Sequence, residues 1–159
     1  MISVDVQIEI PKNTNVKYEY DHVNHKLQCD RILHVPFMYP FNYGYILNTL
    51  SGDGDPLDAV VLCEPSLYPT CFIKCKIIGA LLTEDENGCD DKILLVPETF
   101  VDPESKHIND ISDVDSHLLS KIKYFFEHYK DLEKGKFVVI KNFVNAIDAV
   151  KIYEKCKHN

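Results

Sequence analysis

The sequence is poor in arginine, in positive charge and in long hydrophobic runs. Only Arg31 of its 17 basic residues is an arginine, and 25 acidic residues give the 159-residue chain a formal charge of −8 at pH 7. An acidic surface offers no counter-charge to nucleic acid or to an anionic membrane, which argues against both as main partners. No apolar run approaches the roughly 20 residues that span a bilayer. The first residues also lack the basic and apolar regions of a signal peptide, so we expect a cytoplasmic protein.

Motifs of several other protein classes are missing as well. The six cysteines contain no CxxC pair and no cysteine–histidine array, which argues against a zinc site. No Walker loop is present, which disfavours a phosphohydrolase that acts on nucleoside triphosphates. Repeats, low-complexity tracts and Gly/Ser linkers are also absent. We therefore expect a single domain over residues 1–159.

The hydrophobic pattern predicts strands first and helices later. Residues 4–10 alternate apolar and polar side chains, as in a half-buried strand. Further strands are expected at residues 17–20, 27–33, 58–63, 71–82, 92–96 and 137–140. Residues 34–52 hold two prolines and several aromatics, which predicts an ordered loop.

The helical pattern begins at Ser116, where apolar residues recur at three- and four-residue steps and predict a helix of about 15 residues. Asn145 is a suitable N-cap for a second helix. Strand and helix do not alternate along the chain. This order predicts an α+β fold, with a small antiparallel barrel and helices on its flank.

The middle of the chain concentrates the negative charge, since residues 53–115 hold 15 acidic and 4 basic residues. A Gly/Pro turn at 53–58 can bring Asp53, Asp55 and Asp58 together. Converging carboxylates repel one another unless a cation lies between them. Oxygen ligands favour hard dications such as Mg²⁺. The segment is either a solvated acidic surface or a metal site.

The first acidic turn does not match a calcium loop, and the second acidic turn is ambiguous by itself. A calcium loop starting at Asp53 fails at its fifth and sixth positions, which are Leu57 and Asp58. A second acidic turn at residues 83–91 is, by itself, typical of a solvated hairpin. If the two acidic turns converge, they form a site for several metal ions.

Taken together, these residues resemble the soluble inorganic pyrophosphatases of family I. The matching segments are 8–11, 17–19, 30–31, 39–45, the Asp-Gly-Asp-Pro-Leu-Asp stretch at 53–58, 85–86 with Asp90 and Lys92, and 125–136. They run in order along most of the chain, and its length is similar to that of the compact bacterial type. The resemblance implies a five-stranded OB-like β-barrel with flanking helices. It also implies hydrolysis of pyrophosphate to two phosphates, with three or four Mg²⁺ per site.

The resemblance assigns a role to each matching residue. The implied metal ligands are Asp53, Asp58, Asp90, Asp85 and Glu9, and the implied general base is Asp55. The implied phosphate-binding residues are Lys17, Arg31, Tyr43, Lys92, Tyr129 and Lys130. Glu19 and Tyr39 match positions that support these groups or act through water, and Glu86 matches a further acidic position. We interpret the remaining charges of the last segment, which are Glu127, His128, Asp131, Glu133 and Lys134, as helix-surface residues.

The same resemblance implies that pyrophosphate binds as its magnesium complex. It also favours a homo-oligomer, a hexamer above all. The alternative from another class is a binding module that keeps an OB-like barrel for anions, single strands or a protein. The acidity of residues 53–115 opposes the binding of single strands.

Overall fold

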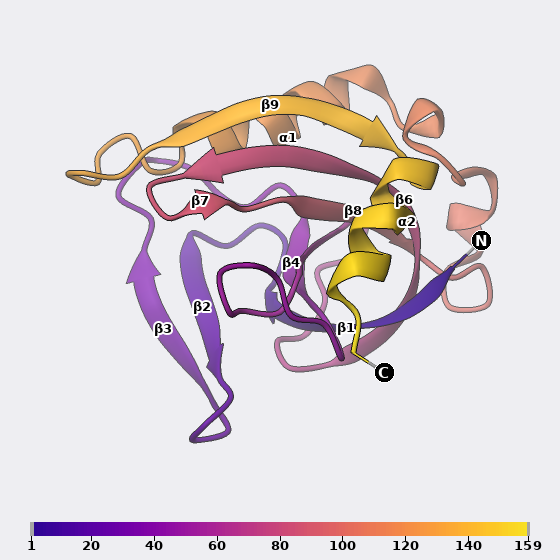
Figure 1. Cartoon of the computed structure of the whole chain (residues 1–159), viewed down its shortest axis with the longest axis horizontal. Helices are drawn as coiled ribbons and strands as arrows, with labels where there is room; N and C mark the ends of the chain where they lie inside the picture. Colours follow the sequence, from indigo (N-terminus) through magenta and orange to yellow (C-terminus); the bar gives the residue numbers. More distant parts are fainter. Residues whose placement is uncertain (1, 159) are drawn as a thin grey trace.

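The structure, a computed structural model, describes residues 2–158 (Figure 1). The strands are β1 (Ser3–Ile10), β2 (Val16–Asp21), β3 (Lys26–Ile32), β4 (Asn42–Ile46), β5 (Asp58–Val61), β6 (Phe72–Asp85), β7 (Gly88–Cys89), β8 (Lys92–Pro97) and β9 (Val138–Asn145). The helices are α1 (Ser116–His128) and α2 (Ala146–Cys156), and short 3-10 turns lie at Pro103–His107 and Ile111–Asp113.

Five strands close into a barrel. They follow the order β1-β4-β5-β8-β6, and β6 pairs back with β1. Strand β9 pairs with β6 outside this ring, whereas β2 and β3 form a separate hairpin that extends away from the barrel (Figure 1). The expected α+β fold, a small five-stranded OB-like barrel with flanking helices, is confirmed.

The barrel is mixed rather than antiparallel, which corrects one expectation. Strands β5 and β8 run parallel, with Asp58 opposite Lys92, and the other pairs of the ring are antiparallel. Parallel partners need a long crossover connection, and the 62–91 segment with the long strand β6 provides it. A local hydrophobic pattern does not show whether two strands far apart in the sequence pair in the parallel or the antiparallel direction.

Strand β4 lies within the segment 34–52, which we expected to be a loop. Pro36 and Pro40 both precede β4, so neither removes a hydrogen bond from it. All five residues of β4 are buried, between β1 and β5. The expectation is therefore right for residues 34–41 and wrong for residues 42–46.

The two helices cover different apolar clusters. Phe125 and Phe126 of α1 pack in a cluster with Leu94, whereas Ala149 of α2 packs in another with Leu95. Strand β8 thus buries both of its faces. Among residues 2–158, no helix is both long enough and apolar enough to cross a membrane.

The start of α2 follows the predicted capping. The Asn145 side chain accepts a hydrogen bond from the Asp148 backbone N–H at 2.9 Å. Strand β9, predicted only to residue 140, continues to this cap, so the last strand leads directly into the last helix.

Gly44 allows β1 and β4 to approach closely. A Cβ at this position would lie 1.9 Å from the backbone oxygen of Gln7. The β1–β4 register shifts between Ile8 and Ile10, immediately beside this contact. Since the obstructing atom belongs to the backbone of a paired strand, it cannot move aside without disturbing the barrel.

We expect Gly44→Ala to lower the free energy of unfolding by about 3 kcal/mol or more, because overpacking in a core displaces the surrounding backbone. Gly52→Ala is the matched control, since a Cβ there would meet nothing within 4 Å. Urea unfolding measures both. Equal midpoints for the two variants would contradict the steric argument.

Candidate active site

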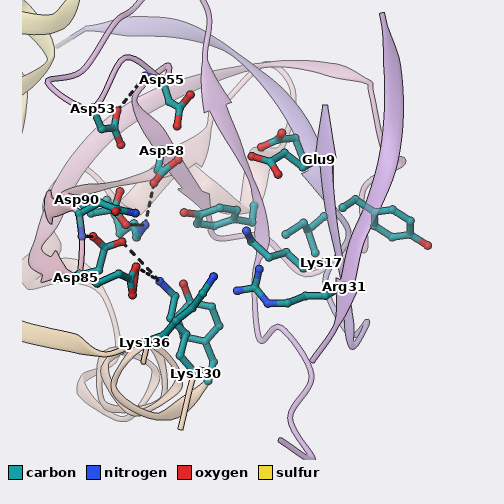
Figure 2. A pocket seen from close by; sticks show the side chains of 18 of the residues that line it. Glu9, Lys17, Arg31, Asp53, Asp55, Asp58, Asp85, Asp90, Lys130 and Lys136 are labelled. Atoms are coloured by element: carbon teal, nitrogen blue, oxygen red, sulfur yellow. Dashed lines mark hydrogen bonds and ion pairs between the residues drawn. The ribbon is translucent and has the colours of Figure 1, made fainter. Parts of the chain in front are cut away.

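One pocket collects nearly all of the residues that the sequence singles out (Figure 2). The lining residues among them are Glu9, Lys17, Glu19, Arg31, Tyr43, Asp53, Asp55, Asp58, Asp85, Glu86, Asp90, Lys92, Tyr129 and Lys130. They come from the barrel strands, from the β2–β3 hairpin and from the end of α1. Lys17 and Arg31 face Asp53, Asp55 and Asp90 from the opposite side of the pocket (Figure 2).

Tyr39 lies behind the pocket rather than in its lining. Its side chain is buried, and its ring centroid lies 4.7 Å from that of Phe125 and 6.2 Å from that of Tyr43. This position suits a residue that supports the pocket wall.

The 51–55 turn holds the first acidic group. The Ser51 hydroxyl and the Asp55 backbone N–H both donate to Oδ1 of Asp53, at 2.6 and 2.9 Å. Gly54 has a φ of +87°, which favours glycine. Burial, and then the carboxylates of Asp53 and Asp90, raise the pKa of Asp55.

Lys92 is the most buried charge of the pocket. Its ammonium donates to Oδ2 of Asp58 at 2.8 Å and to Oδ2 of Asp90 at 2.7 Å. Burial opposes the charged form, but the surrounding negative groups outweigh it, so the pKa of Lys92 lies well above its ordinary value. The Tyr43 and Phe126 rings lie 5.7 and 5.6 Å from this nitrogen.

A second lysine lies between two further acids. Lys130 Nζ lies 3.5 Å from Oδ2 of Asp85 and 3.6 Å from Oε2 of Glu86. Lys130 directly follows Tyr129, whose ring stacks on Phe125 with centroids 5.2 Å apart. The packing of α1 thereby brings Tyr129 and Lys130 to the second acidic turn.

Glu9 lies near the hairpin side of the pocket. Its Oε2 accepts a hydrogen bond from the Tyr20 backbone N–H at 2.8 Å. Burial raises the pKa of Glu9 to about 7, and the charge of Asp58 adds to this effect. The groups around Glu9 thus offset little of the cost of burying its negative charge.

Arg31 and Lys17 are register partners on the β2–β3 hairpin. Asp30 lies between them: its Oδ2 contacts Arg31 Nη1 and lies 3.6 Å from Lys17 Nζ. Glu133, which we expected on a helix surface, is instead buried, with Oε1 3.0 Å from Arg31 Nε. That expectation is wrong because Glu133 lies in the turn that follows α1, and its side chain points toward the guanidinium of Arg31 on the hairpin.

Five other residues line the same pocket without having been singled out: Ile10, Tyr18, Asn87, Cys89 and Lys136. Among these five residues, Lys136 is the one that adds a further positive charge to the acidic pocket. Its position at the end of the matching segment 125–136 is the sequence signal that could have identified it.

The donor set of the pocket fits hard dications. Eight carboxylates and five cationic side chains line it, so negative charge is in excess. Within residues 2–158, no three acidic, histidine or cysteine side chains already form a compact metal-binding group. Lys92 lies between two of the carboxylates and Lys130 between two others. All-oxygen donors of this kind suit Mg²⁺.

Carboxylates that face lysines and an arginine, on a small OB-like barrel, are a combination typical of enzymes that act on phosphate compounds with the help of metal ions. The particular family follows from comparison with known proteins. The Inorganic pyrophosphatase family matches residues 6–159, and the chain belongs to this family.

Individual relatives resemble almost the whole chain. It is 51% identical to the inorganic pyrophosphatase of Nanoarchaeum equitans over 152 residues, which are 96% of this chain and 94% of that protein. The solved structure of the Helicobacter pylori inorganic pyrophosphatase superposes with a TM-score of 0.94 at 44% identity, covering 96% of this chain and 90% of that one. The structure from Thermus thermophilus gives a TM-score of 0.94 at 38% identity, with coverages of 97% and 88%.

We expect Lys92→Met to lower the free energy of unfolding by about 3 kcal/mol in metal-free buffer, because two partly buried carboxylates lose the buried cation that they share. Lys74→Met is the control, since the Lys74–Asp5 pair is half exposed and an exposed pair contributes at most about 1 kcal/mol. Urea denaturation compares the two. A similar small loss in both variants would show that Lys92 does not stabilise the pocket.

Proposed function

We propose that the protein hydrolyses inorganic pyrophosphate to two phosphates in a Mg²⁺-dependent reaction. The observation that carries this proposal is the convergence of fourteen family-matching residues in one pocket, in a chain that belongs to the inorganic pyrophosphatase family. The excess of carboxylates supports a substrate that binds as its magnesium complex.

The proposed metal ligands are Asp53, Asp58, Asp90, Asp85 and Glu9. By analogy with the family, the site would hold three or four Mg²⁺. Bound Mg²⁺ lowers the pKa of coordinated water and offsets the charge of the phosphates. Glu86 and Glu19 line the same pocket and would hold metal-bound water in place.

Asp55 is the proposed general base. Its carboxylate would accept the proton of the attacking water as the bond from the water oxygen to phosphorus forms and the bridging P–O bond breaks, which releases the second phosphate as the leaving group. The 51–55 turn supports this role, because Asp53 binds the Asp55 backbone and leaves the Asp55 carboxylate at the pocket surface. The pKa of Asp55 is raised, which moves it toward neutral pH, and a general base is most effective when its pKa lies near the operating pH.

The cationic side chains and two tyrosines would hold the phosphates. Lys17 and Arg31 face the substrate from the hairpin, and Lys92 and Lys130 face it from the barrel and α1. Burial raises the pKa of Tyr43 and of Tyr129. Both phenols therefore stay protonated and can donate hydrogen bonds to phosphate oxygens without adding charge.

We further propose a homo-oligomer, with a hexamer as the favoured form. Met38 and Tyr124 are 63% and 57% exposed and line one apolar groove, which would suit burial against another copy. Six free cysteines support a cytoplasmic setting, where thiols stay reduced.

The first test is phosphate release from pyrophosphate by the purified protein. We expect release with Mg²⁺, and loss of activity when EDTA removes the metal. No Mg²⁺-dependent release from folded protein would refute the proposed function. In the same assay, Asp55→Asn should lower kcat by about 100-fold or more, the typical contribution of a general base. Asp5→Asn, on the exposed part of β1, is the matched control and should leave kcat unchanged.

The second test replaces the only arginine. We expect Arg31→Lys to lower kcat/KM by about 10- to 100-fold, because lysine loses the planar fork that binds phosphate at two points. Lys26→Ala, an exposed lysine on the same strand, should change kcat/KM less than twofold. Equal kinetics for the two variants would mean that Arg31 has no special role.

A further inference from the structure

The arginine side of the pocket has an unusual support. Arg31 belongs to the β2–β3 hairpin, which forms its own two-stranded sheet outside the barrel ring. An isolated two-stranded hairpin is marginally stable. The backbone N–H of Tyr20 anchors the hairpin to β1 by donating to Glu9 at 2.8 Å, and Tyr18 packs against the apolar cluster of α1. Neither contact involves the Arg31 side chain, whose position depends on its own ion pairs.

Glu133 makes one of these pairs from the α1 side of the molecule, and it does not itself line the pocket. It lies in the turn after α1, where its backbone N–H donates to the Lys130 carbonyl at 2.9 Å and its carbonyl accepts from the Lys136 N–H. Its side chain is only 6% exposed and that of Arg31 is 17% exposed. The same turn thus presents Lys130 and Lys136 to the pocket and Glu133 to the arginine.

The contact depends on charge more than on hydrogen-bond geometry. Glu133 Oε1 lies 3.0 Å from Arg31 Nε, yet Nε and Oε2 are buried without an aligned hydrogen-bond partner in the part of the chain described. Asp30 holds Nη1 from within the hairpin. A guanidinium has five N–H groups in one plane, so two such contacts leave others for phosphate.

We propose that Glu133 is a positioning residue that fixes the guanidinium of Arg31 and joins the hairpin wall to the α1 wall of the pocket. The inference rests on the proposed function only in the identity of the ligand, a pyrophosphate held by Arg31. The cost of burying the Glu133 carboxylate is compensated only while cations stay close to it. Arg31 Nε lies 3.0 Å from Oε1, and the half-exposed Lys136 lies farther away, with Nζ 4.0 Å from the same oxygen. Because Glu133 does not line the pocket, its role is to act through Arg31.

The chemical test uses the fact that the chain has a single arginine. Phenylglyoxal modifies arginine side chains, so peptide mapping after treatment reports on Arg31 alone. We expect Glu133→Gln, which keeps the shape but removes the charge, to speed modification of Arg31 several-fold. Glu133→Asp, which keeps the charge, should restore part of the protection. Glu127→Gln is the matched control, because Glu127 is an exposed glutamate on α1.

The kinetic test is a double-mutant cycle with pyrophosphate as substrate. We expect Glu133→Gln to lower kcat/KM by about tenfold or more, as for a lost charged contact, but to add less than about twofold once Arg31→Met is present. A merely structural role would lower kcat/KM by the same factor in both backgrounds, and that result would overturn the proposal. A thermal unfolding curve of each variant identifies a temperature at which all variants are folded, and the kinetics are measured at that temperature.

The outcomes separate this inference from the proposed function. If the unmodified protein releases no phosphate, the proposed function fails, and the phenylglyoxal rates still decide whether Glu133 holds Arg31. If the unmodified protein is active and Glu133→Gln matches it in both modification rate and kcat/KM, the positioning role is refuted.

Discussion

The pocket depends on the parallel pairing of β5 with β8. This register sets Asp58 directly opposite Lys92, at the ends of two strands whose other residues form the barrel core. Asp90, two residues before Lys92, then reaches the same ammonium. A buried cation shared by two carboxylates needs a rigid frame, because small displacements leave a charge uncompensated. The closed barrel provides this frame.

The other elements bring further charges to that centre. The β6–β7 hairpin and the end of α1 place Asp85 beside Lys130, and the β2–β3 hairpin supplies Arg31 from the opposite side. Negative charge remains in excess, so the pocket suits an anionic substrate only if metal ions accompany it. An acidic protein can in this way act on an anion, which its overall charge would otherwise repel.

Much of the fold was predictable because hydrophobic periodicity is local. The alternation in β1, the apolar stripe of α1 and the Asn145 cap all act within a few residues. The direction of β5 against β8 was not predictable from such patterns. Strand β4 was missed because the two prolines that precede it predicted a loop for the whole segment, although neither proline lies within the strand.

The residue types of the candidate site could be identified from the amino-acid sequence: carboxylates in a turn that can bring them together, one arginine among lysines, and motifs of one enzyme family in order. Which of these charges face one another became known from the fold. Glu133 and Glu127 are the same residue type six residues apart, yet the first is buried against Arg31 and the second is exposed on α1. The physical reason is that burial and pairing of a charge depend on contacts between segments about a hundred residues apart, which no local pattern encodes.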